Sequence, residues 1–88
     1  MRRACKIDIN QPEIVEDLRE AGASVQILSQ IGKGCPDILV GYNEVNYLME
    51  IKYLKGTLTD DQRVFHSQWN GKVHIVRTSQ EAIRIIKP

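Results

Sequence analysis

Residues 36–52 read PDILVGYNEVNYLMEIK, and their pattern is the clearest indication of the fold. It holds two continuous apolar runs, ILV at 38–40 and YLM at 47–49, separated by a short loop. Such runs are typical of β-strands, and their continuity indicates a sheet that is covered on both faces. We expect strands from about 37 to 42 and from about 47 to 53.

Three charged residues mark the ends of these strands. Asp37 begins the first strand, whereas Glu50 and Lys52 lie at the end of the second. Side chains two residues apart in a strand point to the same face, so Glu50 and Lys52 share one. If the two strands pair as antiparallel neighbours, Asp37 enters the sheet where Glu50 and Lys52 leave it. The sequence therefore predicts that all three meet at one edge of the sheet.

Two carboxylates beside an ammonium group suit a particular chemistry. Mg²⁺ prefers carboxylate, carbonyl and water oxygens, and it keeps several waters while it binds substrate phosphate. A bound metal lowers the pKa of its water and neutralises charge on the scissile phosphate, and a nearby ammonium stabilises the transition state. Asp37 and Glu50 are the candidate ligands and Lys52 the candidate ammonium. Alternatively, Asp37 is simply a turn residue after proline, and Glu50 and Lys52 belong to the solvated edge of a strand.

The same residues resemble a known superfamily. Pro36-Asp37 with Glu50-Ile51-Lys52 resembles the PD-(D/E)XK nucleases. Over nearly the whole chain, the sequence resembles the small standalone type of VRR-NUC (virus-type replication-repair nuclease) domain. The motifs that carry this resemblance are NQxEIV at 10–15, GxGxPD at 32–37, ExK at 50–52, LTxxQ at 58–62 and Trp69.

The resemblance implies a Mg²⁺- or Mn²⁺-dependent DNA endonuclease, whose small viral members act as homodimers on branched DNA such as Holliday junctions. It places metal and catalytic roles on Asp37, Glu50 and Lys52. It also implies that the carbonyl of Ile51 is a further metal ligand.

A first helix is predicted from Gln11 to Ala21, with Asn10 as its N-cap and Gly22 as its end. Gln11 falls on the apolar stripe of this helix, so we expect it to face inward. Burying an unpaired amide costs about 1–3 kcal/mol, and the active site could supply the partner. Gln11 is therefore a candidate auxiliary site residue, and Glu13 a weaker one. Alternatively, Gln11 bonds free backbone amides and Glu13 stabilises the positive helix end.

A second helix is predicted from Thr59 to Asn70, ended by Gly71, with Phe65 and Trp69 packed inward. Thr59 and Gln62 have the spacing of a capping box.

Gln62 lies on the same stripe as these aromatic residues. It is a candidate to hydrogen-bond near the scissile phosphate or an active-site ligand, or it acts only in capping. His66 on this helix is interpreted as a packing or surface residue.

The remaining segments complete the order α-β-β-β-α-β-α. A first strand spans Ser24 to Ile31, a last strand spans Val73 to Arg77, and a last helix begins at Thr78. Between the first two strands, Lys33 lies in a glycine-rich loop that either approaches a phosphate or is simply a turn. The chain is predicted to be α/β, with a mixed sheet flanked by helices as in PD-(D/E)XK nucleases.

Composition supports one domain over residues 1–88, with a core small enough for oligomerisation to add burial. The apolar runs are too short to cross a bilayer. Cys5 and Cys35 are too few for a zinc site, and a reducing cytosol keeps both as thiols.

A net charge of +1 is low for a DNA-binding protein, so any basic surface has to be local. Lys33, Lys52 and Lys55 lie in or beside the motifs, and Arg2, Arg3 and Lys6 gather near the start of the sequence. These basic residues are not followed by an apolar stretch, so no secretory signal is predicted. We expect a cytoplasmic location, in the host cell if the protein is viral.

The sequence thus predicts a divalent-metal-dependent, structure-selective DNA endonuclease that hydrolyses phosphodiester bonds, with DNA and a second copy of the chain as partners. Asp37, Glu50, Lys52, Gln11 and Gln62 are the predicted catalytic residues, and Asp37, Glu50 and Ile51 the predicted ligands of Mg²⁺ or Mn²⁺. A less selective DNA nuclease and a noncatalytic DNA-binding module that keeps the nuclease fold are the alternatives.

Overall fold

The structure is a computed structural model that describes residues 7–88, so Cys5 and the basic residues before Ile7 lie outside the described part. The element order α-β-β-β-α-β-α is confirmed. The helices are α1 (Gln11–Glu20), α2 (Asp60–Gln68) and α3 (Ser79–Ile86), and the strands are β1 (Ser24–Ile27), β2 (Ile38–Tyr42), β3 (Val45–Ile51) and β4 (Val73–Val76).

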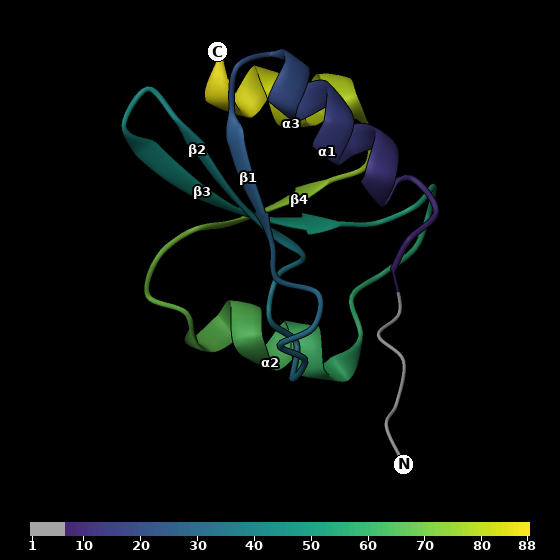
Figure 1. Ribbon diagram of the computed structural model, residues 1–88. Helices are drawn as coiled ribbons and strands as arrows, with labels where there is room; N and C mark the ends of the chain where they lie inside the picture. Colours follow the sequence, from purple (N-terminus) through teal and green to yellow (C-terminus); the bar gives the residue numbers. More distant parts are fainter. Residues whose placement is uncertain (1–6) are drawn as a thin grey trace.

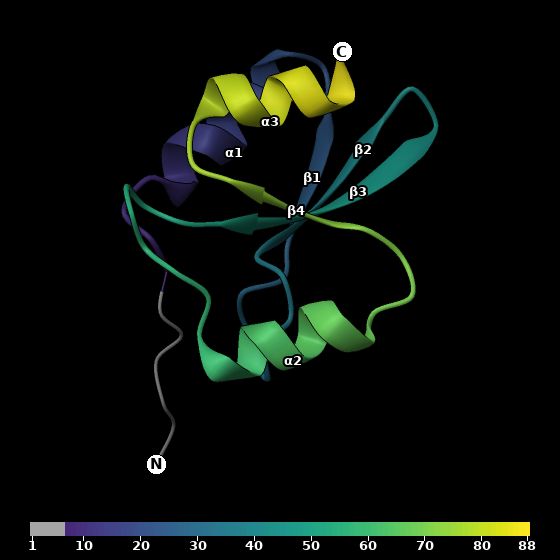
Figure 2. The ribbon, with the colours of Figure 1, turned by 180° about the vertical axis from the view of Figure 1, so that it is seen from behind.

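The four strands form one mixed sheet in the order β1-β2-β3-β4. β1 and β3 run antiparallel to β2, whereas β4 runs parallel to β3. A parallel pair needs a crossover connection, and α2 lies within it. Helices α1 and α3 lie side by side on one face of the sheet, and α2 lies on the opposite side (Figures 1 and 2).

The hydrophobic core lies between the sheet and the α1–α3 pair. The apolar stripe predicted for the first helix is buried there, with Leu18 fully covered. The core residues, which come from the sheet, from α1 and α3 and from the turn after α1, are Ile14, Val15, Leu18, Ala23, Ile38, Val40, Met49, Ile51, Val76, Ala82 and Ile86. Side chains alternate along a strand, and Glu50 lies between the core residues Met49 and Ile51 of β3. Glu50 therefore points to the α2 side of the sheet.

The β2–β3 hairpin has a two-residue turn at Asn43 and Glu44, with Tyr42 paired to Val45. Both turn residues have left-handed backbone angles, φ 53° and 66°, as a type I′ turn requires. This turn twists in the same sense as the strands and sets their register. A slip of one residue would move Glu50 to the core face, so the turn also positions the site.

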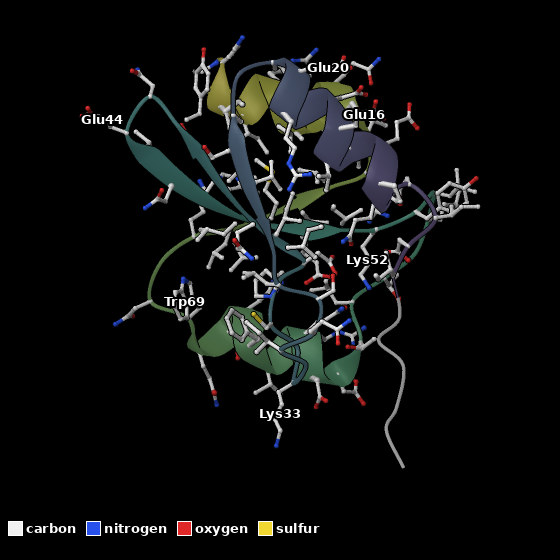
Figure 3. All side chains as sticks on the ribbon, in the orientation of Figure 1. Glu16, Glu20, Lys33, Glu44, Lys52 and Trp69 are labelled. Carbon is white, nitrogen blue, oxygen red and sulfur yellow. The ribbon has the colours of Figure 1, made fainter. Side chains whose placement is uncertain are left out.

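Helix α2 is attached more loosely than predicted. It contains no buried residue, and Trp69 is 47% exposed, so the prediction that Trp69 packs inward is wrong. The physical reason is that the helix ends at Gln68 and the chain turns extended at Trp69, with φ −78° and ψ 124°. The Trp69 ring stacks on half-buried Phe65 at 5.3 Å and stays at the surface (Figure 3).

Two other local predictions are also corrected. Asn10 occupies the N-cap position of α1, but its side chain makes no capping bond. Its amide group donates instead to the carbonyl oxygens of Lys52 and Arg77, at 3.2 and 2.9 Å, and so ties α1 to the ends of β3 and β4. The first strand ends at Ile27 rather than Ile31, because the Ile31 amide turns back to the Leu28 carbonyl.

Candidate active site

Asp37 lies directly before β2 and reaches the end of β3. Its Oδ2 accepts a hydrogen bond of 2.7 Å from the Ile51 amide. Its own amide donates to the carbonyl of Met49, a residue that already pairs with Ile38. Two successive residues thus oppose one, which is the arrangement of a β-bulge, and bulges re-aim side chains at strand ends. The bulge turns the Asp37 carboxylate toward β3.

Glu50 is buried on the face of the sheet that looks toward α2, with only 1% of its surface exposed. Its Oε2 accepts a hydrogen bond of 3.0 Å from Nε2 of Gln62. The Gln62 side chain is itself fixed, because its Oε1 accepts from the Thr59 amide in the predicted capping box. Gln62 therefore both caps α2 and holds Glu50, which combines the two roles that the sequence left open.

The two carboxyl groups perturb each other. Burial, a hydrogen bond with Asp37 and the Asp37 charge together raise the pKa of Glu50 to about 9, although the charge of Lys52 opposes the rise. Burial also raises the pKa of Asp37, although its hydrogen bonds to Glu50 and the Ile51 amide oppose the rise. The pair therefore shares a proton at neutral pH, with Glu50 as its carrier.

Lys52 follows β3 and is nearly buried, with 9% of its surface exposed. Its amide donates to the Val76 carbonyl at 3.0 Å, and its own carbonyl accepts from Asn10. Its charge lowers the pKa of both carboxyl groups, so the ammonium lies within electrostatic reach of them. Figure 3 shows Lys52 at the end of β3 away from Trp69. The structure thus brings Asp37, Glu50 and Lys52 to one edge of the sheet.

The backbone of Ile51 also faces the carboxylates. The amide and the carbonyl of one strand residue point to the same side of the strand. Because the Ile51 amide donates to Asp37, its carbonyl oxygen is directed to the same edge. The Ile51 carbonyl oxygen thus points toward the Asp37 carboxylate, as its predicted role as a metal ligand requires.

The two predicted residues of α1 lie elsewhere. Gln11 does face inward, with 3% of its surface exposed, but its Nε2 donates to the hydroxyl of Ser29 at 3.2 Å. Its partner is therefore a loop hydroxyl rather than a site carboxylate. Glu13 is exposed and borders a different groove, together with Asp17 and Arg77.

The glycine-rich loop supports α2. Lys33 is exposed, has a left-handed φ of 57° and points away from the molecule (Figure 3). Gly34 has φ +78° and lies so close to α2 that an added Cβ would be 2.2 Å from the Asp61 carbonyl oxygen. The loop therefore acts as a turn against the helix that carries Gln62.

His66 is a site residue that the sequence interpretation missed. Its Nε2 lies 3.9 Å from Oε1 of Glu50, and both atoms are buried without a hydrogen-bond partner. Burial and the charge of Lys52 lower the pKa of His66. The available signal was helical spacing, because His66 lies four residues after Gln62 and so on the same face.

Asp8 and Cys35 also border the site. The charge of Asp8 raises the pKa of both Asp37 and Glu50. Burial raises the pKa of the Cys35 thiol, and the charges of Glu50 and Asp37 add to this effect. Cys35 is half-buried beside Pro36 and Asp37. No local pattern points to Asp8, which reaches the site only through the tertiary fold.

The donor set fits a hard divalent cation. The buried Glu50 and the half-buried Asp37 both have raised pKa values, and Glu50 Oε1 has no hydrogen-bond partner, so added positive charge is favourable here. Within residues 7–88, no three His, Cys, Asp or Glu side chains form a ready metal cluster. An ion here would rest on few protein donors and keep several waters, as Mg²⁺ does.

Comparison of the chain with protein-family models, with curated proteins and with solved structures finds no match. No helix among residues 7–88 is long and apolar enough to cross a membrane. The class of protein that the structure defines is an α/β domain with a four-stranded mixed sheet and an acidic, partly buried site at one sheet edge.

Proposed function

We propose that this protein is a divalent-metal-dependent, structure-selective DNA endonuclease, with a PD-(D/E)XK-like fold of the small VRR-NUC type. The observation that carries the proposal is the meeting of Asp37, Glu50 and Lys52 at the adjoining ends of two antiparallel strands. Carboxyl groups whose pKa values are raised by burial and by each other are costly to keep, and such groups cluster at functional sites.

Asp37, Glu50 and the Ile51 carbonyl are the proposed ligands of Mg²⁺ or Mn²⁺. The ion would supply a water of lowered pKa and neutralise charge on the phosphate. Lys52 would stabilise the negative charge that develops on the phosphate oxygens. Gln62 keeps the Glu50 carboxylate oriented through its 3.0 Å hydrogen bond.

Gln11 has a supporting role in this proposal. It fixes the loop after β1 through Ser29, while its Oε1 stays buried without a partner. Its contribution to turnover would therefore pass through the position of that loop.

The proposed substrate is branched DNA such as a Holliday junction, and the proposed active form is a homodimer. A domain of 88 residues has little surface with which to hold a four-way junction. A two-fold pair would present two such sites to opposing strands. We also propose that the protein acts on DNA in the cytoplasm, which is the host-cell cytoplasm if the protein is viral.

The test compares cleavage of a labelled four-way junction, a flap, linear duplex and single-stranded DNA, each with Mg²⁺, Mn²⁺ or EDTA. Wild type should cut the junction and lose this activity in EDTA. Glu50→Gln should be inactive, whereas Glu44→Gln, the same change at the exposed hairpin turn, should keep full activity.

Other outcomes separate the alternatives. Equal cutting of all four substrates would favour a less selective nuclease. A gel shift of the junction with no cleavage under either metal would favour a noncatalytic DNA-binding module. Sedimentation of the protein as a monomer under active conditions would contradict the homodimer.

A further inference from the structure

Helix α2 directs two side chains at Glu50, one turn apart. Gln62 hydrogen-bonds to Oε2 at 3.0 Å, whereas Nε2 of His66 stops 3.9 Å from Oε1. Both Glu50 Oε1 and His66 Nε2 are buried and have no hydrogen-bond partner. A buried polar atom without a partner costs about 1–3 kcal/mol, so two that face each other indicate an absent third group.

The spacing of the two atoms narrows the choice of that group. Direct N–H···O hydrogen bonds measure about 2.7–3.2 Å, so 3.9 Å is too long for one. A tetrahedral water bonded to both atoms would hold them about 4.6 Å apart, so 3.9 Å is short for a bridging water. Nitrogen and oxygen donors each lie about 2.1 Å from a transition-metal ion, so two donors on one ion are about 3.0 Å apart at a right angle and about 4.2 Å apart when opposite each other. The separation of 3.9 Å lies between these limits, so one ion reaches both atoms at an open angle.

The surrounding charges also favour a cation. Asp37 and Asp8 both act electrostatically on Glu50, and Lys52 offsets them only in part. His66 is mostly covered, with 16% of its side chain exposed, so its buried Nε2 has little access to water that could satisfy it.

We propose that His66 Nε2 and Glu50 Oε1 bind one divalent first-row transition-metal ion between them, so that the site takes Mn²⁺ in preference to Mg²⁺. This inference rests on the proposed metal-dependent function and adds a nitrogen ligand to it. Imidazole nitrogen is a poor ligand for Mg²⁺ but a good one for transition metals, so one histidine shifts the selectivity of an oxygen site.

The composition of the chain makes the proposal directly testable, because His66 and His74 are its two histidines. His74 is a matched control. It is half-buried on β4, pairs with Met49 on the core face of the sheet and contacts the Tyr47 ring at 6.0 Å. It therefore lies on the opposite face of the sheet from Glu50.

The experiment is pulsed electron paramagnetic resonance of the full chain with bound Mn²⁺. Wild type should show electron-spin coupling to a histidine nitrogen, and selective nitrogen-15 labelling of histidine should change that signal. His66→Ala should abolish the coupling, and His74→Ala should retain it. The isotope shift in wild type keeps the test valid even if His66→Ala fails to fold.

Thermal unfolding with each ion supplies a second readout. In wild type, Mn²⁺ should bind at least about tenfold more tightly than Mg²⁺, since one added ligand worth about 1.4 kcal/mol gives that factor. In His66→Ala, Mn²⁺ affinity should fall to that of Mg²⁺, while Mg²⁺ affinity stays the same. His66→Gln, which keeps a polar side chain without imidazole nitrogen, should behave like His66→Ala.

The outcomes separate this inference from the proposed function. Bound Mn²⁺ without histidine coupling, in a protein that still cleaves DNA, would overturn the role of His66 and leave the nuclease proposal standing. Absence of both divalent-ion binding and cleavage would overturn both.

Discussion

At the scale of single residues, Glu50 shows how function opposes stability in this fold. The carboxyl group is buried, its Oε1 has no hydrogen-bond partner, and its pKa is raised to about 9 from 4.5. The folded protein therefore holds a proton that the unfolded chain releases. The stability associated with Glu50 is complete below about pH 4.5 and falls as pH rises toward 9.

Glu50→Gln should remove this dependence, because glutamine is neutral and still accepts the hydrogen bond from Gln62. Without divalent ions at pH 8, we expect this variant to be more stable than wild type by about 1–3 kcal/mol, because wild type must keep Glu50 protonated well above its ordinary pKa. Urea unfolding in EDTA at pH 5 and pH 8 measures the difference, with Glu44→Gln as the exposed control. Equal stabilisation at both pH values would contradict the role assigned to the Glu50 proton.

Lys52 and Asp37 should separate catalysis from metal binding. Lys52→Ala should lower the turnover rate about 10²–10³-fold, the usual effect of removing one transition-state stabiliser, while metal affinity stays nearly unchanged. Asp37→Ala should weaken both, since it removes a proposed ligand and the acceptor for the Ile51 amide. Calorimetric titration with Mn²⁺ beside single-turnover cleavage measures the two effects. Equal metal affinity of wild type and Asp37→Ala would exclude Asp37 as a ligand.

At the scale of elements, the contact between the glycine-rich loop and α2 controls the position of Gln62. An alanine Cβ at Gly34 would collide with the Asp61 carbonyl, and φ +78° is already unfavourable for alanine. Gly32 has nearly the same φ, +79°, but open space around it. Gly32→Ala should therefore cost only about 1 kcal/mol of backbone strain, whereas Gly34→Ala should cost more and displace α2.

Amide hydrogen exchange measures this difference element by element. In Gly34→Ala, exchange in α2 should accelerate while exchange in α1 and the central strands stays slow, because α2 has no buried residue and opens locally. In Gly32→Ala, exchange in α2 should change little. Equal effects of the two variants would mean that the close approach at Asp61 does not hold the helix.

The types of the elements could be predicted because the spacing of apolar residues and the positions of capping residues, glycine and proline are local properties of the sequence. The buried stripe of α1 and the shared face of Glu50 and Lys52 follow from helix and strand periods alone. The exposure of Trp69 could not be predicted, since it depends on where the chain leaves α2. The position of Asp8 near the carboxylates could not be predicted either, because it depends on the path of the chain before α1. His66 was not chosen as a site residue because a single histidine on a helix has no distinctive pattern.

At the scale of the whole molecule, a net charge of +1 leaves little general attraction for DNA. Asp8 and Asp37 add negative charge where a phosphate would bind, and Glu50 adds more when it loses its proton. If basic side chains alone bound the DNA, its affinity would rise at low salt and would not depend on a divalent ion at the site. We expect the opposite here, with affinity controlled by a metal that cancels the carboxylate charge.

Affinity for a labelled four-way junction should therefore rise at least about tenfold when EDTA is replaced by Ca²⁺, which binds oxygen ligands as Mg²⁺ does. Changes in monovalent salt should have the smaller effect, because few phosphates are neutralised by lysine or arginine. Asp37→Asn with Glu50→Gln removes the repulsion without metal, so this double variant should bind equally well in EDTA and in Ca²⁺. Gel-shift titrations at two salt concentrations test both statements. Wild type that binds as tightly in EDTA as in Ca²⁺ would show instead that a basic surface holds the DNA.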